Sequence, residues 1–140
     1  MHTAVWQMSE KPGFQLIDDL DEPGGRLLAY SLREGEVSAD DLRPYWARLD
    51  AAKKDGRTLR IYAEMYGRSK LDGAAFVEKM KRWDESKAVI ERMAIVGEEK
   101  WLQDYAKLMS SATRIPIRAY PPRDKEAAVG WLREELRERK

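Results

Sequence analysis

A short segment that follows a predicted strand carries the side chains best suited to binding chemistry. Between Met65 and Lys70 the chain has two large apolar residues, a glycine, two cations and a hydroxyl group. If Ser69 were phosphorylated, Arg68 and Lys70 would stabilise the phosphate. We define the candidate interaction loop as Met65, Tyr66, Arg68, Ser69, Lys70 and Asp72. Two interpretations remain open: a contact for a partner or ligand, and an ordinary connecting loop.

Catalytic and metal-binding chemistry finds little support in the rest of the sequence. The chain has no Cys and its one His is His2, so thiolate chemistry, histidine-based metal sites and a Ser-His-Asp triad are not expected. The 25 acidic residues form no evident general acid–base pair. No glycine-rich phosphate motif follows a strand, and Glu98 and Glu99 at a predicted helix start would repel a phosphate. We therefore expect a protein that is not an enzyme and holds no cofactor or metal.

Composition indicates one domain without a polyanionic partner. The chain has 140 residues, 43% of them hydrophobic, which is enough for one packed core. The 26 Lys and Arg nearly balance the 25 Asp and Glu, and a net charge of +1 gives no basis for binding nucleic acid. No apolar run is long enough to cross a membrane, and the N-terminus does not resemble a signal peptide. These features predict a cytoplasmic protein.

The candidate loop belongs to an alternation of strands and helices. Residues 1–13 show no periodicity and are predicted to be a flexible arm, followed by one domain over residues 14–140. The patterns predict strands over 14–20, 26–33, 58–64, 92–97 and 114–120, and helices ending near 54, beginning at 72, beginning near 98 and beginning near 124. Ser38 and Asp41 resemble a helix-start pair. Pro116 confines the last strand to a sheet edge.

This order predicts an α/β fold with a five-stranded, mostly parallel sheet and an antiparallel first strand. If the strands lie in sequential order, right-handed crossovers place every connecting helix on the same face. The four helices should therefore lie mainly on one face and leave the other open. The alternation of Leu59, Ile61 and Ala63 with polar residues supports an open face. We define the candidate open face as Arg60, Tyr62, Arg118 and Tyr120.

With that element order, the chain resembles the SpoIIAA-like family, relatives of anti-sigma-factor antagonists in the STAS superfamily. The similarity is strongest in the segment from Arg92 to Trp101 and in the strand 117–120, with a further match at 126–132. The resemblance implies successive strand–helix units around one sheet. Regulatory members carry a phosphorylatable Ser before a Gly at the start of the second helix, where this chain has Asp72. Phosphorylation is therefore not expected to be its primary control.

Two functions of different classes follow. The first is a non-catalytic regulatory or protein-interaction module that uses the open face and the candidate loop. The second is a carrier of a small apolar or lipid-like ligand, which would need a cavity of about 300 Å³ or more. Because a parallel sheet is normally covered on both faces, we also expect a homodimer that joins through the open face, near the apolar arm residues Val5, Trp6 and Met8.

Overall fold

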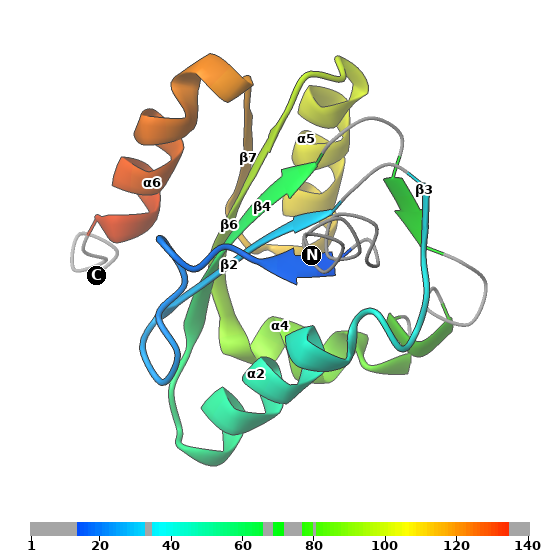
Figure 1. The fold of residues 1–140 in the computed structure, drawn as a ribbon, viewed down its shortest axis with the longest axis vertical. Coiled ribbons are helices and arrows are strands. Elements are labelled where there is room, and N and C mark those ends of the chain that lie inside the picture. Colours follow the sequence, from blue (N-terminus) through cyan, green and yellow to red (C-terminus); the bar gives the residue numbers. More distant parts are fainter. Residues whose placement is uncertain (1–13, 33–34, 66–68, 72–76, 80, 135–140) are drawn as a thin grey trace, which may run out of the picture.

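The protein is built on a five-stranded sheet with the order β1-β2-β4-β6-β7. The computed structural model describes residues 14–32, 35–65, 69–71, 77–79 and 81–134 (Figure 1). The strands are β1 (Phe14–Leu16), β2 (Leu27–Leu32), β4 (Leu59–Met65), β6 (Ile90–Gly97) and β7 (Ile117–Tyr120). β1 is antiparallel to β2, and all other neighbours are parallel. The sequential, mixed sheet predicted from the sequence is confirmed.

The edges of this sheet follow from local chemistry. β1 and β2 form the predicted hairpin, closed by a turn in which Gly24 has a positive φ of 76°. At the other edge, Pro116 immediately precedes β7, and its carbonyl accepts a hydrogen bond from the amide of Met93 at 3.0 Å. Because proline has no amide hydrogen, this stretch can accept but not donate at that position, as an edge strand allows.

The helices are α2 (Arg43–Lys54), α4 (Trp83–Val89), α5 (Trp101–Thr113), the 3₁₀ turn η1 (Pro122–Asp124) and α6 (Lys125–Arg133). Ser38 and Asp41 make the reciprocal bonds of a capping pair ahead of α2. The amide of Ser38 donates to the Asp41 carboxylate at 2.8 Å, and the amide of Asp41 donates to the Ser38 hydroxyl at 3.1 Å. In the part of the chain that the structure describes, no helix is both long and apolar enough to span a membrane.

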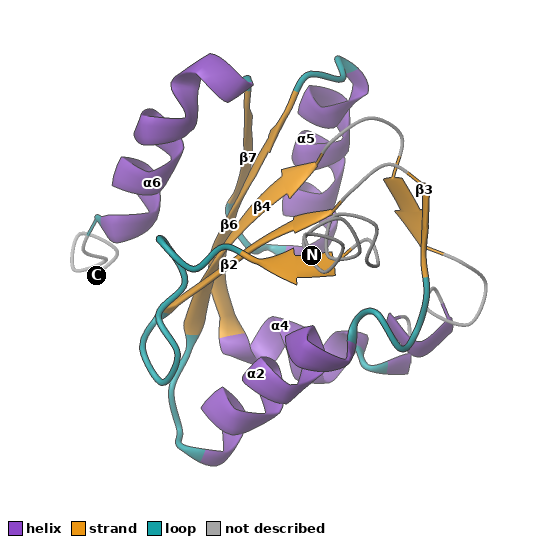
Figure 2. Cartoon of the chain, viewed as in Figure 1, coloured by secondary structure: helices purple, strands orange, loops and turns teal. Residues whose placement is uncertain are grey.

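α2, α4 and α5 lie on one face of the sheet, as predicted, but α6 lies on the other (Figures 1 and 2). The prediction of an open face is therefore wrong. The handedness rule governs a helix that joins two parallel strands, and α6 follows the last strand, so either face was available to it. The uncovered face offered the apolar surface. There α6 buries Ala128, Trp131 and Leu132 against a cluster that comprises Leu27, Ala29, Tyr62, Ala94 and Val96.

Arg60, which was predicted to lie on the open face, and the neighbouring Arg92 instead hold α6 in place. The Arg60 guanidinium, 7% exposed as a residue, donates to the carbonyls of Leu132 and Glu134 at the end of α6. Arg92 donates to the Trp131 carbonyl at 2.6 Å. Cations suit this helix end because its last carbonyls lack partners within the helix and carry partial negative charge. The mixture of charge and apolar residues in these strands therefore indicates a covering helix, not exposure to solvent.

The remaining open-face residues also contact α6 or its surroundings. The Arg118 guanidinium lies over the Trp131 ring at 4.5 Å, and Tyr120 packs against the same ring at 6.4 Å. The hydroxyl of Tyr62 donates to Glu64 at 2.7 Å, and Glu64 pairs with Lys125 at the start of α6 at 3.1 Å. The face that was expected to join two subunits is thus occupied by the chain's own last helix.

A small second sheet pairs β3 (Gly35–Val37) with β5 (Ser69–Leu71) in parallel. The segment expected to be a loop after β4 therefore contains a strand, because the backbone at Ser69 and Lys70 pairs with Gly35 and Glu36. Of the other candidate-loop residues, Met65 ends β4, whereas Tyr66, Arg68 and Asp72 lie outside the described residues, as does the predicted arm.

Candidate functional site

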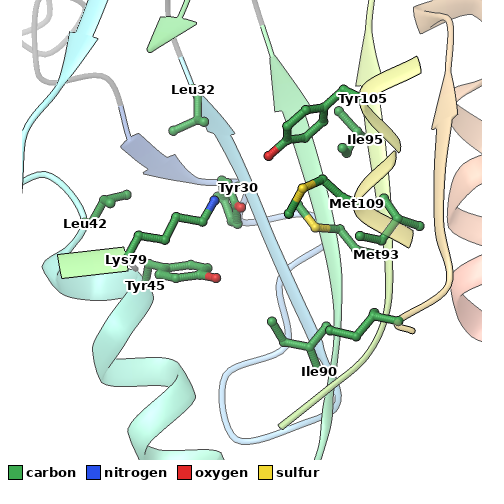
Figure 3. Close-up of a pocket in the computed structure, with 12 residues that line it drawn as sticks. Tyr30, Leu32, Leu42, Tyr45, Lys79, Ile90, Met93, Ile95, Tyr105 and Met109 are labelled. Carbon is green, nitrogen blue, oxygen red and sulfur yellow. The ribbon is translucent and has the colours of Figure 1, made fainter. Parts of the chain in front are cut away.

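An apolar hollow lies between the sheet and the helices of the α2–α5 face (Figure 3). It consists of two adjoining compartments of about 80 and 180 Å³. We name it the tyrosine cavity and define it by the residues that line both compartments: Tyr30, Leu32, Lys79, Met93, Ile95 and Tyr105. The smaller compartment extends to Tyr45 and Met109, and the larger one to Ala63, Met65 and Trp101.

The register of the sheet explains why space remains here. Tyr30 in β2 is paired with Ala63 in β4, which is paired with Ile95 in β6. These residues form one row across the sheet, with their side chains on the same face. The methyl group of Ala63 is short between its bulky neighbours, so the sheet surface dips where the larger compartment lies.

Aromatic packing keeps the wall of the cavity in place. Phe14 and Tyr30 stack at 4.7 Å, and Tyr45 of α2 meets the edge of Tyr30 at 5.7 Å. Across the hollow, Tyr105 belongs to α5 and makes an edge contact with Trp101 at 5.7 Å. Figure 3 shows Met93 and Met109 with their sulfur atoms on the cavity side. Methionine side chains are flexible and polarizable, so this wall can adapt to different apolar shapes.

Among the described residues that line the cavity, the titratable groups are the hydroxyls of three tyrosines and the amine of Lys79. Burial raises the pKa of Tyr30, and the neighbouring Tyr45 and Tyr105 raise it further. Burial likewise raises the pKa of Tyr45 and of Tyr105, so all three phenols are neutral over the physiological range. Burial lowers the pKa of Lys79 from its usual 10.5. The cavity therefore offers neutral hydroxyl groups and one amine in an apolar wall.

A second, shallow groove lies at the amino ends of β4 and β6, where Glu91 is the most buried carboxylate. Burial alone would raise the pKa of Glu91, but hydrogen bonds from Thr58 at 2.5 Å and Arg60 at 2.7 Å, with the charge of Arg26, hold it below the usual 4.5. This carboxylate is ionised and fully engaged, so it is suited to holding the strands together, not to proton transfer. Among the described residues no cluster of side chains could hold a metal ion.

The structure places the predicted site residues in different parts of the molecule. Met65 lines the cavity, but Ser69 and Lys70 lie in β5, and the open-face residues lie under α6. Lys79 and the cavity tyrosines were missed. A signal existed for Lys79, because it falls between Phe76 and Trp83 at helical spacing, within a predicted apolar stripe. A single cation on the apolar stripe of a helix indicates a position where a charged group faces the protein interior.

These features define a small α/β domain of the STAS type, with a hollow on the face covered by α2, α4 and α5. The family model for SpoIIAA-like proteins matches residues 30–133, and the chain belongs to this family. It is similar in fold to the crystal structure of an uncharacterized protein of the DUF3478 family with a SpoIIAA-like fold from Shewanella loihica PV-4. The TM-score is 0.63 at 17% identity, over 88% of this chain and 96% of that one. A comparison with curated proteins finds no match.

Proposed function

We propose that this protein binds a small apolar molecule in the tyrosine cavity and acts without catalysis, as a carrier or as a domain that responds to the ligand. The observation that carries this proposal is the apolar hollow above Ala63, set in an otherwise packed core. Its larger compartment, about 180 Å³, is smaller than the roughly 300 Å³ expected for a carrier of a lipid-like ligand, but it is comparable to an engineered apolar cavity of about 150 Å³ that holds benzene. The size favours a ring or a short alkyl chain over a whole lipid.

Filling the hollow tests this function. Small neutral molecules such as indole, benzyl alcohol and phenylacetamide are titrated into the protein, and heat of binding and thermal stability are measured. We expect binding to the native protein and loss of binding in Ala63→Leu, whose longer side chain occupies the larger compartment. Ala127→Leu is the matched control, because Ala127 is exposed on α6, away from the cavity. Equal binding by all three proteins, or by none, would contradict the proposal.

A second candidate, the regulatory interaction module, is favoured by the outer surface of α5. Trp101, which also lines the cavity, is 47% exposed and Leu108 is 65% exposed, and their spacing of about two helical turns places them on one side of α5. Exposed tryptophan is enriched in protein interfaces. Since α6 covers the sheet face, this side of α5 is the surface on which the expected homodimer or another partner is proposed to bind. Light scattering of the native protein and of Trp101→Ala tests self-association, and a 16.2 kDa particle at tens of micromolar would exclude the dimer.

A further inference from the structure

Lys79 is the one charged side chain among the described residues that line the tyrosine cavity. Figure 3 shows it extending across the hollow, with its amine end on the side of Tyr30. The remaining described lining is aliphatic, methionine or aromatic. A lysine beside apolar surface normally extends its ammonium group to water, whereas this one points inward.

No described carboxylate compensates this amine. The described residues include no ion pair to Lys79, and burial is the one cause of its lowered pKa, with no opposing contribution from a nearby negative charge. A buried charge is costly unless it is paired and hydrogen-bonded. The described part of the cavity therefore does not compensate the charge of Lys79, which a bound anion would do.

Hydroxyl groups approach the same space from three elements. Tyr30 comes from β2, Tyr45 from α2 and Tyr105 from α5. They are close enough for the charge of one to influence the pKa of another. Because the phenols stay neutral, each can donate a hydrogen bond to an acceptor held near Lys79. A carboxylate oxygen is such an acceptor, and it would bring the missing negative charge.

We propose that the ligand of the tyrosine cavity is a small amphipathic carboxylate, whose apolar part fills the hollow above Ala63 and whose anionic head pairs with Lys79. This inference rests on the proposed function and names its ligand class. A single cation with neutral hydroxyl groups matches a group of one negative charge. Phosphate groups, in contrast, are typically held by several cations or by arrays of backbone amides, neither of which the described cavity lining provides.

The test compares ligands that share an apolar part and differ in charge. Phenylacetate, phenylacetamide and 2-phenylethylamine are titrated by calorimetry into the native protein, Lys79→Met and the control Lys107→Met, whose exposed lysine lies on α5. We expect phenylacetate to bind the native protein at least about tenfold more tightly than phenylacetamide. A hydrogen bond to a charged group contributes roughly the free energy that corresponds to a tenfold change in affinity. Lys79→Met should lose this preference and still bind phenylacetamide, whereas Lys107→Met should behave as the native protein.

Proton exchange provides a second readout that a structural role of Lys79 would not move. Binding of the anion favours the ammonium form, so at a pH above the lowered pKa of Lys79 the complex should take up a proton. Calorimetry in buffers of different ionisation enthalpy measures this uptake, which should vanish in Lys79→Met. If phenylacetamide or 2-phenylethylamine binds the native protein as tightly as phenylacetate, the proposed ligand class is wrong, while the proposed binding function of the cavity stands. If none of the three binds, the proposed function fails and this inference fails with it.

Discussion

Replacing Lys79 by methionine should stabilise the ligand-free protein. The change shortens the unbranched side chain by one atom and removes an amine that no described carboxylate pairs with. A buried polar group without a partner costs about 1–3 kcal/mol. Lys79 is only partly buried as a residue, so we expect the free energy of unfolding to rise by about 1 kcal/mol at pH 7, near the low end of that range.

The gain should depend on pH in a defined direction. The pKa of Lys79 is lowered in the folded protein, so between that value and 10.5 the unfolded chain binds more protons than the folded one. In that window the stability of the native protein rises with pH, by at most about 1.4 kcal/mol per pH unit for one group. Lys79→Met lacks this contribution. The free energy of unfolding of Lys79→Met should therefore exceed that of the native protein most at pH 7, and the difference should shrink as the pH approaches 10.5.

Urea unfolding of both proteins at pH 7, 8, 9 and 9.5 measures the difference. The raised pKa values of the cavity tyrosines affect stability above pH 10 in both proteins alike, so they cancel in the comparison. Lys107→Met serves as the control for loss of an exposed lysine, and its difference from the native protein should stay near zero. A constant difference at every pH, or a less stable Lys79→Met, would refute the claim that burial disfavours the charge of Lys79.

Further predictions concern the cavity floor, α6 and the end of β6. Ala63→Leu should change the free energy of unfolding by less than about 1.5 kcal/mol in urea, because the added volume enters an existing hollow; a larger loss would mean that the hollow is not there. Arg60→Met should cost about 3 kcal/mol in the same assay, since it removes a buried cation from Glu91 and from the end of α6. The exposed Arg43→Met is its control and should cost less than about 1 kcal/mol. Gly97→Ala should cost about 1–3 kcal/mol in urea, because a Cβ there would lie 2.6 Å from Leu102 and 3.0 Å from a backbone oxygen; an unchanged midpoint would show that α5 can shift.

The sheet was predictable because its signals are local. Turn residues at 21–25 mark the hairpin, Pro116 marks the edge, and the apolar run at 93–97 marks an inner strand. Each depends on the backbone geometry of a few neighbouring residues. The sequential strand order, which the sequence analysis took as a condition, agrees with the tendency of consecutive elements to lie side by side. The β3–β5 pair was missed because three-residue strands carry too few residues for an alternation to show.

The position of α6 could not be obtained in the same way. It depends on contacts between the polar ends of strand side chains and the end of a helix that is distant in the sequence. Arg60 and the Leu132 carbonyl, for example, are 72 positions apart. In the sequence, Arg60 on a strand indicates solvent unless the acceptor is known. The error was to treat charge as evidence of exposure, although an arginine can be buried where unsatisfied carbonyls need donors.

The two faces of the sheet differ in how the polar groups of their described residues are satisfied, and this difference supports the proposed ligand site. On the α6 face, Arg60 and Arg92 bond helix carbonyls and Glu64 pairs with Lys125, so that charges and acceptors there have protein partners. On the opposite face, Lys79 meets neutral tyrosines and a hollow. Packing that only stabilised the fold would gain from an apolar residue at position 79 and a larger one at Ala63. We therefore expect a ligand to bind on the face where the amine of Lys79 has no ion pair among the described residues and where open space remains.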